Sequence, residues 1–207
     1  EIDAYPALTR AGATRPIPDW DHWIRDAPGA GTYGPYFYTK EDVREILAYA
    51  AARHIRVVPE IEIGGHSREV MICYPGFSCL KPDKFWDLVR GDGKNLDQVG
   101  AVCLGNDEVI KFYEKVLDEV CELFPDEVVH IGGDECPKTF WKKCPKCQAR
   151  MKKLGLKDEN ELQAWLTHHF VDYLKAKGRR AIGWDEILEG GLGDGAMVQS
   201  WRMAGWQ

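Results

Sequence analysis

Two adjacent carboxylates follow a short apolar run near the middle of the chain. The run Val128–Ile131, with His130 inside it, is followed by Gly132-Gly133 and then by Asp134 and Glu135. Two glycines after a buried strand let the backbone bend sharply and let a ligand approach closely. Carboxylates at such a turn could act as acid, base or electrostatic stabiliser in hydrolysis. A simpler interpretation is that both acids only cap the next helix.

Polar and aromatic residues also follow the other predicted strands. If Asp134 and Glu135 only capped a helix, these additional residues would remain unexplained. These residues are Glu62, His66, Trp184, Asp185, Glu186, Trp201 and Arg202. Flat rings cover the apolar face of a pyranose, so the tryptophans at strand ends favour a sugar as the ligand.

Glycoside hydrolysis would give the two central carboxylates separate tasks. Retaining enzymes place two carboxyl groups about 5 Å apart and inverting enzymes about 6.5–9.5 Å apart, on opposite sides of the bond. Neighbours at a strand end point in different directions, so Asp134 and Glu135 are poorly suited to flank one anomeric carbon. A division of labour suits them better, in which Glu135 protonates the leaving oxygen. If the substrate carries its own nucleophile, such as a 2-acetamido group, Asp134 could orient and polarise that amide.

Three other functions stay open at this point. A two-carboxylate retaining β-glycosidase would use Glu135 as acid and Glu186 as nucleophile. A metal-dependent barrel hydrolase would use His66, His130 and Asp134, although no His-x-His pair lies near a first strand. A non-catalytic sugar-binding relative would bind without turnover, although an idle carboxylate pair in a pocket is costly to desolvate.

Helices that position these residues are marked by their caps. Thr39 with Asp42 three residues later predicts a helix that ends near residues 53–54. A second helix starts at residue 106 or 107. A third starts at residue 158 or 160 and is closed by Gly178.

Strands are predicted at residues 55–61, 128–131, 180–183 and 196–200. Alternation of helix and strand favours an α/β fold with a parallel sheet. Functional residues after every strand favour a (β/α)8 TIM barrel, with a doubly wound sheet as the alternative. Four strands cannot close such a barrel, so we expect residues 1–207 to be a partial catalytic domain with strands missing at both ends.

The remaining segments are predicted to be irregular. Residues 1–38 are expected to form a loop that leads in from an absent strand, and about 74–105 a long loop. Residues 137–154 are predicted to form an irregular helical excursion.

Cysteine spacing leaves several pairings open among seven cysteines. Cys144 and Cys147 have the spacing of a zinc knuckle, but a structural zinc site needs two further ligands, and the nearest candidate is Cys136. The sequence therefore favours a disulfide or free thiols over zinc. Cys79 and Cys103 could pair if the protein is exported.

Composition narrows the range of partners. The net charge of -6 is spread without a basic stripe, which argues against nucleic acid as a partner. No apolar run is long enough to span a bilayer, and the first residues do not have the features of a signal peptide.

The segment from His130 to Glu135 resembles the signature of the family 20 glycoside hydrolases, the β-N-acetylhexosaminidases. Residues 59–67 are similar to that family's third-strand segment, with Ile-Gly-Gly-His where the family usually has Met-Pro-Gly-His. Residues 183–186 and 200–202 resemble its fifth and sixth strand ends, and residues 5–9 resemble the stretch after its second strand. The resemblance implies that the chain carries roughly the third to sixth strands of a TIM barrel with their helices.

The same resemblance implies a function and a role for each matched residue. It implies removal of terminal non-reducing N-acetyl-β-hexosamine residues from a carbohydrate substrate by a retaining, substrate-assisted mechanism. Glu135 would act as general acid and then base, and Asp134 would bind the acetamido N–H and stabilise the oxazolinium intermediate. No cofactor and no metal are expected. Members of the family act mostly outside the cytoplasm or in lysosomes, which implies an exported protein (periplasmic, extracellular or lysosomal). The supporting or substrate-binding residues would be His66, Trp184, Trp201 and His130.

Overall fold

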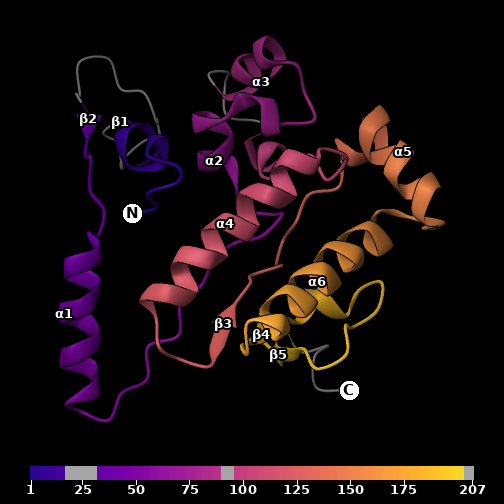
Figure 1. Ribbon diagram of the computed structural model, residues 1–207. Coiled ribbons are helices and arrows are strands. Elements are labelled where there is room, and N and C mark those ends of the chain that lie inside the picture. Colours follow the sequence, from indigo (N-terminus) through magenta and orange to yellow (C-terminus); the bar gives the residue numbers. More distant parts are fainter. Residues whose placement is uncertain (17–31, 90–95, 203–207) are drawn as a thin grey trace.

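The computed structural model describes residues 1–16, 32–89 and 96–202 (Figure 1). A parallel sheet of three strands carries the central turn, residues 132–135. The strands are β3 (Val128–His130), β4 (Arg180–Trp184) and β5 (Met197–Gln199), in the order β3-β4-β5. Val129 lies opposite Ala181 in this sheet. Because all three strands run the same way, their carboxyl ends meet at one edge, and the predicted parallel α/β arrangement is confirmed.

The predicted strand at residues 55–61 is wrong for most of its length. Its backbone pairs with the sheet through a single parallel bridge between Glu60 and His130. Ile55 and Val58 are 58% and 41% exposed, so this β-branched run is not buried. A β-branched run becomes a buried strand only where other parts of the fold pack on both of its faces. The described residues pack only against the end of this run near Glu60.

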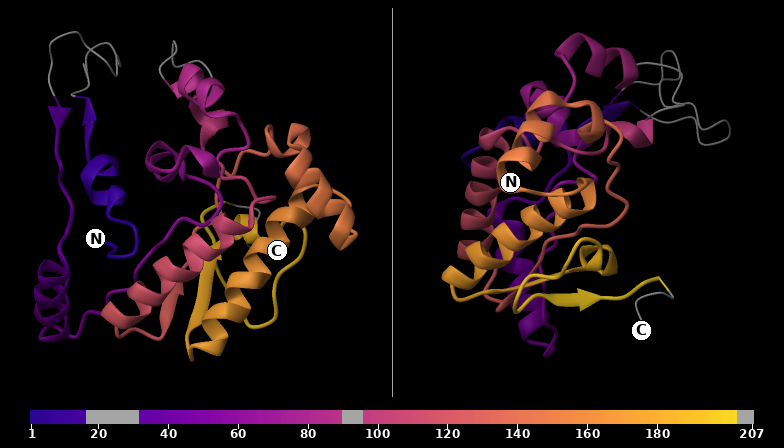
Figure 2. Two further views of the ribbon diagram at one scale, coloured as in Figure 1. Left: turned by 45° about the horizontal axis from the view of Figure 1, so that its top comes forward. Right: turned by 90° about the vertical axis from the view of Figure 1, so that its right-hand side faces the viewer.

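Two long helices lie along the sheet, side by side (Figures 1 and 2). The first, α4 (Asp107–Leu123), begins after Asn106, whose side chain accepts the backbone N–H of Glu108. The second, α6 (Glu159–Ala176), begins after Asp158 and packs against β4. Both predicted helices are confirmed.

The helix before them, α1 (Lys40–Ala51), has the predicted capping box between Thr39 and Asp42. Of its residues only Ala50 is buried, whereas Tyr49 is 62% exposed. The predicted apolar face of α1 is therefore largely open among the described residues, and the helix stands to one side of the molecule (Figure 2).

The predicted loop at residues 74–105 is instead mostly short helices. It contains η2 (Pro75–Phe77), α3 (Pro82–Val89) and η3 (Leu96–Val99), and α2 (Arg68–Cys73) precedes it. Prolines and polar residues mark the boundaries of these helices, so each apolar pattern is too short to stand out in the sequence. Residues 90–95 lie outside the described part of the chain.

Short elements also interrupt residues 1–38, which were predicted to form a loop. A π-helical turn, η1 (Leu8–Gly12), precedes an antiparallel pair of β1 (Arg15–Pro16) and β2 (Thr32–Tyr33). Residues 17–31 of the predicted loop lie outside the described residues.

The excursion predicted after the central turn is helical. It consists of η4 (Trp141–Lys143) and α5 (Pro145–Leu154), which ends at Gly155 with a φ of 70°. A further short helix, η5 (Asp185–Leu188), follows β4. None of the described helices is long and apolar enough to cross a membrane.

Candidate active site

The turn after β3 brings Asp134 and Glu135 to the carboxyl edge of the sheet. Gly132 has a φ of 64°, and a Cβ atom there would lie 2.1 Å from an oxygen of Glu62. A side chain at position 132 would therefore adopt a rarely populated backbone conformation and would displace the Glu62 carboxyl group. Glu135 itself has a φ of 44°, a left-handed conformation that costs a non-glycine residue about 1–2 kcal/mol.

His66 links both carboxylates. Its Nε2 atom lies 3.2 Å from Oδ2 of Asp134 and 3.6 Å from Oε2 of Glu135. The imidazole is held by a left-handed turn, in which His66 has a φ of 39°. Both carboxylates therefore face one imidazole, which fixes their positions relative to each other.

Exposure separates the two acids. The Asp134 side chain is 20% exposed and that of Glu135 is 62% exposed. Asp134 Oδ1 is buried without a hydrogen-bond partner among the described residues. Glu135 can therefore reach a leaving group near the solvent, whereas Asp134 offers an acceptor inside the site.

Glu62 is the acid that sequence reasoning left without a role. Its carboxyl group lies against Gly132, and burial, followed by the charge of Asp134, raises the pKa of Glu62 to about 8. Glu62 is therefore mostly protonated at neutral pH, which removes the charge repulsion that two close carboxylates would have. The alternation of Glu60 and Glu62 is the sequence signal, since residues two apart in extended backbone share a face.

His130 lies beneath the turn. Its Nδ1 atom accepts the backbone N–H of Gly132 at 3.0 Å, and burial lowers the pKa of His130. The imidazole is therefore neutral and holds the first residue of the turn. The ring centroid of Trp184 lies 4.9 Å from that of His130, and the indole N–H donates to Oε1 of Glu60 at 2.9 Å.

A cleft of about 330 Å³ opens beside Glu135. Trp201 and Arg202 line it, whereas Trp184 packs on His130 outside this lining. Trp201 is 52% exposed, and its indole N–H donates to Oε2 of the buried Glu186 at 3.0 Å. The remaining lining residues are Gly133, Cys136, Lys138, Gln163 and Glu189.

The metal-ligand set suggested by the sequence is not assembled. Among the described residues near the turn, His66, Asp134 and Glu135 place possible ligand atoms within 4.8 Å of one another. His130 is not a member of this group, and its Nδ1 atom accepts the backbone N–H of Gly132. Cys136 is buried, and this burial raises the pKa of its thiol to about 12, so it is not a nucleophile.

Known proteins resemble the whole chain. Residues 1–207 match the sequence profile of the catalytic domain of glycosyl hydrolase family 20. A β-hexosaminidase of Porphyromonas gingivalis is 44% identical over 206 residues, which cover 98% of this chain and 24% of that protein.

Solved structures agree with this match. A β-N-acetylhexosaminidase from Bacteroides fragilis has a TM-score of 0.76 at 37% identity, over 99% of this chain and 37% of that one. An exo-β-N-acetylglucosaminidase from Vibrio harveyi, solved with N-acetylglucosamine, has a TM-score of 0.79 at 31% identity, over 98% of this chain and 31% of that one. The chain thus spans about a quarter to a third of the length of these relatives.

Proposed function

Because the chain belongs to glycosyl hydrolase family 20, we propose that the full-length protein is a β-N-acetylhexosaminidase. It would remove terminal non-reducing N-acetyl-β-hexosamine residues from glycans. The observation that carries this proposal is the meeting of Asp134 and Glu135 at one imidazole. Two acids held at one imidazole, one exposed and one partly buried, suit one proton donor and one stabiliser of a substrate-borne nucleophile.

The reaction that fits this site proceeds in two displacements. Glu135 donates a proton to the glycosidic oxygen, and the bond from that oxygen to the anomeric carbon breaks. The carbonyl oxygen of the substrate's own 2-acetamido group attacks the anomeric carbon, which forms an oxazolinium ion. Asp134 accepts the acetamido N–H and stabilises the positive charge. Glu135 then removes a proton from a water molecule, whose oxygen bonds to the anomeric carbon. The bond from that carbon to the acetamido oxygen breaks, which restores the acetamido group and gives overall retention of configuration.

Supporting residues keep the two acids in these states. His66 holds both carboxylates in place through Nε2. Protonated Glu62 places a neutral group beside Asp134, which avoids repulsion between two carboxylates in the site. Trp201 supplies an exposed ring at the cleft beside Glu135, which suits stacking on a sugar.

We also propose a place for these strands in a complete barrel. The segment of residues 55–61, which is bridged to β3 only at Glu60, would take the place of the third strand of a (β/α)8 barrel, and β3, β4 and β5 would be the fourth to sixth strands. Their parallel order and the gathering of acids at their carboxyl ends support this assignment.

The proposed activity is tested on the full-length gene product with aryl glycosides. We expect cleavage of an aryl N-acetyl-β-glucosaminide, very slow cleavage of the matching β-glucoside, and tight inhibition by a thiazoline mimic of the intermediate. Equal rates on the two substrates would contradict substrate assistance, because only one of them carries the acetamido nucleophile.

A second candidate rests on the cleft, which both Glu135 and Glu186 line. In a two-carboxylate β-glycosidase, Glu186 would be the nucleophile. Trp201 and Arg202 already contact the Glu186 carboxylate, at 3.0 and 3.5 Å, which argues for a positioning role instead. A fluorosugar that labels Glu186 covalently would favour the two-carboxylate mechanism over the first proposal.

A further inference from the structure

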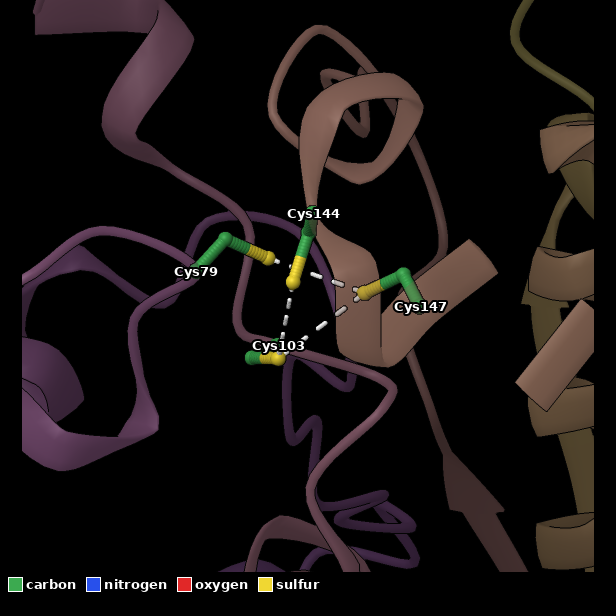
Figure 3. Close-up of side chains that lie close together, drawn as sticks. All are labelled: Cys79, Cys103, Cys144 and Cys147. Carbon is green, nitrogen blue, oxygen red and sulfur yellow. Dashed lines mark hydrogen bonds between the residues drawn. The ribbon is translucent and has the colours of Figure 1, made fainter. Parts of the chain in front are cut away.

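Four cysteines that are widely separated in the sequence meet at one point. Figure 3 shows the sulfur atoms of Cys79, Cys103, Cys144 and Cys147 turned toward one another from three segments of the chain. Cys79 follows η2, Cys103 precedes α4, and the other two lie at the start of α5. All four sulfurs lie within 4.8 Å of one another.

These sulfurs are too far apart for disulfides. The distance from Cys79 Sγ to Cys147 Sγ is 3.7 Å, and Cys103 Sγ lies 3.7 Å from Cys144 Sγ and 3.8 Å from Cys147 Sγ. A disulfide bond is about 2.05 Å long. All seven cysteines are free, so the pairing of Cys79 with Cys103 considered from the sequence is not formed.

The same distances fit four ligands of one metal ion. Zn–S bonds of about 2.3 Å at tetrahedral angles place neighbouring sulfurs about 3.8 Å apart. The measured separations of 3.7, 3.7 and 3.8 Å match this edge length. Three of the four cysteines are buried and Cys79 is half-buried, as expected of a closed structural site without a position for water.

The backbone around the cluster is built for close approach. A Cβ atom at Gly105 would lie 2.2 Å from the carbonyl carbon of Lys146 and 2.4 Å from the backbone nitrogen of Cys147. Only glycine therefore lets the segment after Cys103 reach the turn between Cys144 and Cys147. That turn begins α5, with Cys144 as its N-cap, so the positive end of the helix dipole faces the sulfurs and favours thiolates.

Neighbouring hydrogen bonds hold the three segments together. The N–H of Cys103 donates to the carbonyl of Phe77 at 2.7 Å. The indole N–H of the fully buried Trp141 donates to the carbonyl of Val102 at 2.8 Å. The cluster thus lies where the helices of residues 75–89, the lead into α4 and the start of α5 meet.

We propose that Cys79, Cys103, Cys144 and Cys147 bind one structural zinc ion. On binding, the four thiols lose four protons and form four Zn–S bonds, and no oxidant or reductant takes part. Tetrahedral coordination by four thiolates is typical of zinc. The site does not depend on the proposed glycosidase activity.

The zinc ion would anchor the segment that carries the candidate acid. Residues 136–143 link Glu135 directly to Cys144, and the ion would fix the far end of this link to Cys79 and Cys103. Cross-links between segments far apart in the sequence reduce the entropy of the unfolded chain, so the ion would stabilise the fold as well as the turn.

Metal content of the full-length gene product, purified without an affinity tag that binds metal, tests the site directly. We expect about one zinc ion per chain by elemental mass spectrometry. Cys103→Ser and Cys147→Ser should lose most of it, whereas the control variants Cys73→Ser and Cys121→Ser, at half-buried cysteines outside the cluster, should keep it. Equal zinc in all five proteins, or iron in place of zinc, would overturn the proposal.

A second measurement does not depend on folding of the variants. Wild-type protein is titrated with a mercurial reagent while a chromogenic chelator detects released zinc. We expect release to be complete when the four cluster thiols have reacted, and refolding with Co²⁺ to give the visible bands of tetrahedral thiolate coordination. Two disulfides, or four reduced thiols without released metal, would show that the cluster is not a metal site.

Discussion

The imidazole of His66 lies 3.2 Å from the carboxylate of Asp134, although His66 follows the segment that is bridged to the sheet at Glu60 and Asp134 follows β3. This contact, together with the approach of Glu135 to the same nitrogen at 3.6 Å, fixes both acids relative to each other. Glu135 can therefore act as the acid and Asp134 as the stabiliser only while both side chains keep this arrangement with His66.

Replacing Glu135 by glutamine should remove the proton donor. General acid–base catalysis contributes about 10²–10⁴-fold, so kcat on an aryl N-acetyl-β-glucosaminide with a poor leaving group should fall by about that factor. The loss should be smaller with a good leaving group, because such a group needs less protonation. Glu122→Gln, an exposed site on α4, is the control and should be unaffected. Normal turnover by the Glu135 variant would exclude this residue as the acid.

Replacing His66 by asparagine tests its role as a positioning residue. Asparagine tolerates the left-handed backbone of His66 but has no imidazole to reach the acids. We expect kcat to fall about 10–100-fold, as for other supporting contacts in an active site, with a displaced pH profile. His54→Asn is a matched control, since His54 also has a left-handed backbone, with a φ of 57°, and is exposed. An unchanged pH profile of kcat would remove His66 from the network.

Replacing Glu62 by glutamine should flatten the pH dependence of stability. The folded-state pKa of Glu62 is raised to about 8 from its ordinary value of 4.5, so the folded protein holds this proton more tightly than the unfolded chain. Its contribution to stability is complete below about pH 4.5 and is lost as the pH rises through about 8. Glutamine stays neutral, so denaturation midpoints of the variant should fall less between pH 5 and 8 than those of wild type. Parallel midpoint curves would refute the raised pKa.

A comparison of two glycine-to-alanine variants distinguishes backbone strain from a steric clash of the new Cβ atom. Gly132 and Gly178 have φ values of 64° and 71°, but a Cβ would meet the Glu62 carboxyl group at Gly132 and no atom within 4 Å at Gly178. Gly178→Ala should therefore cost only the left-handed strain, about 1–2 kcal/mol. Gly132→Ala should cost more and should also displace Asp134, which lowers activity. Unfolding free energies from denaturant titration give the comparison, and equal losses would mean that Glu62 can move away freely.

Local patterns determined much of the fold from the sequence alone. The caps at Thr39, Asn106 and Asp158 start their helices where predicted, because capping hydrogen bonds involve only residues within three positions. The turn at Gly132–Glu135 was equally predictable, since its glycines and acids are contiguous. Residues 55–61 were misassigned because the formation of a strand depends on partners elsewhere in the chain.

Only the tertiary structure decided which distant groups meet. The sequence contains Glu62, but its contact with the turn at Gly132, and with it the raised pKa, comes from the bridge of Glu60 to β3. The knuckle of Cys144 and Cys147 was visible in the sequence, and Cys136 was its nearest candidate partner. The fold brings in Cys79 and Cys103 instead, because packing of the intervening helices, and not spacing along the chain, sets the distance between their sulfurs.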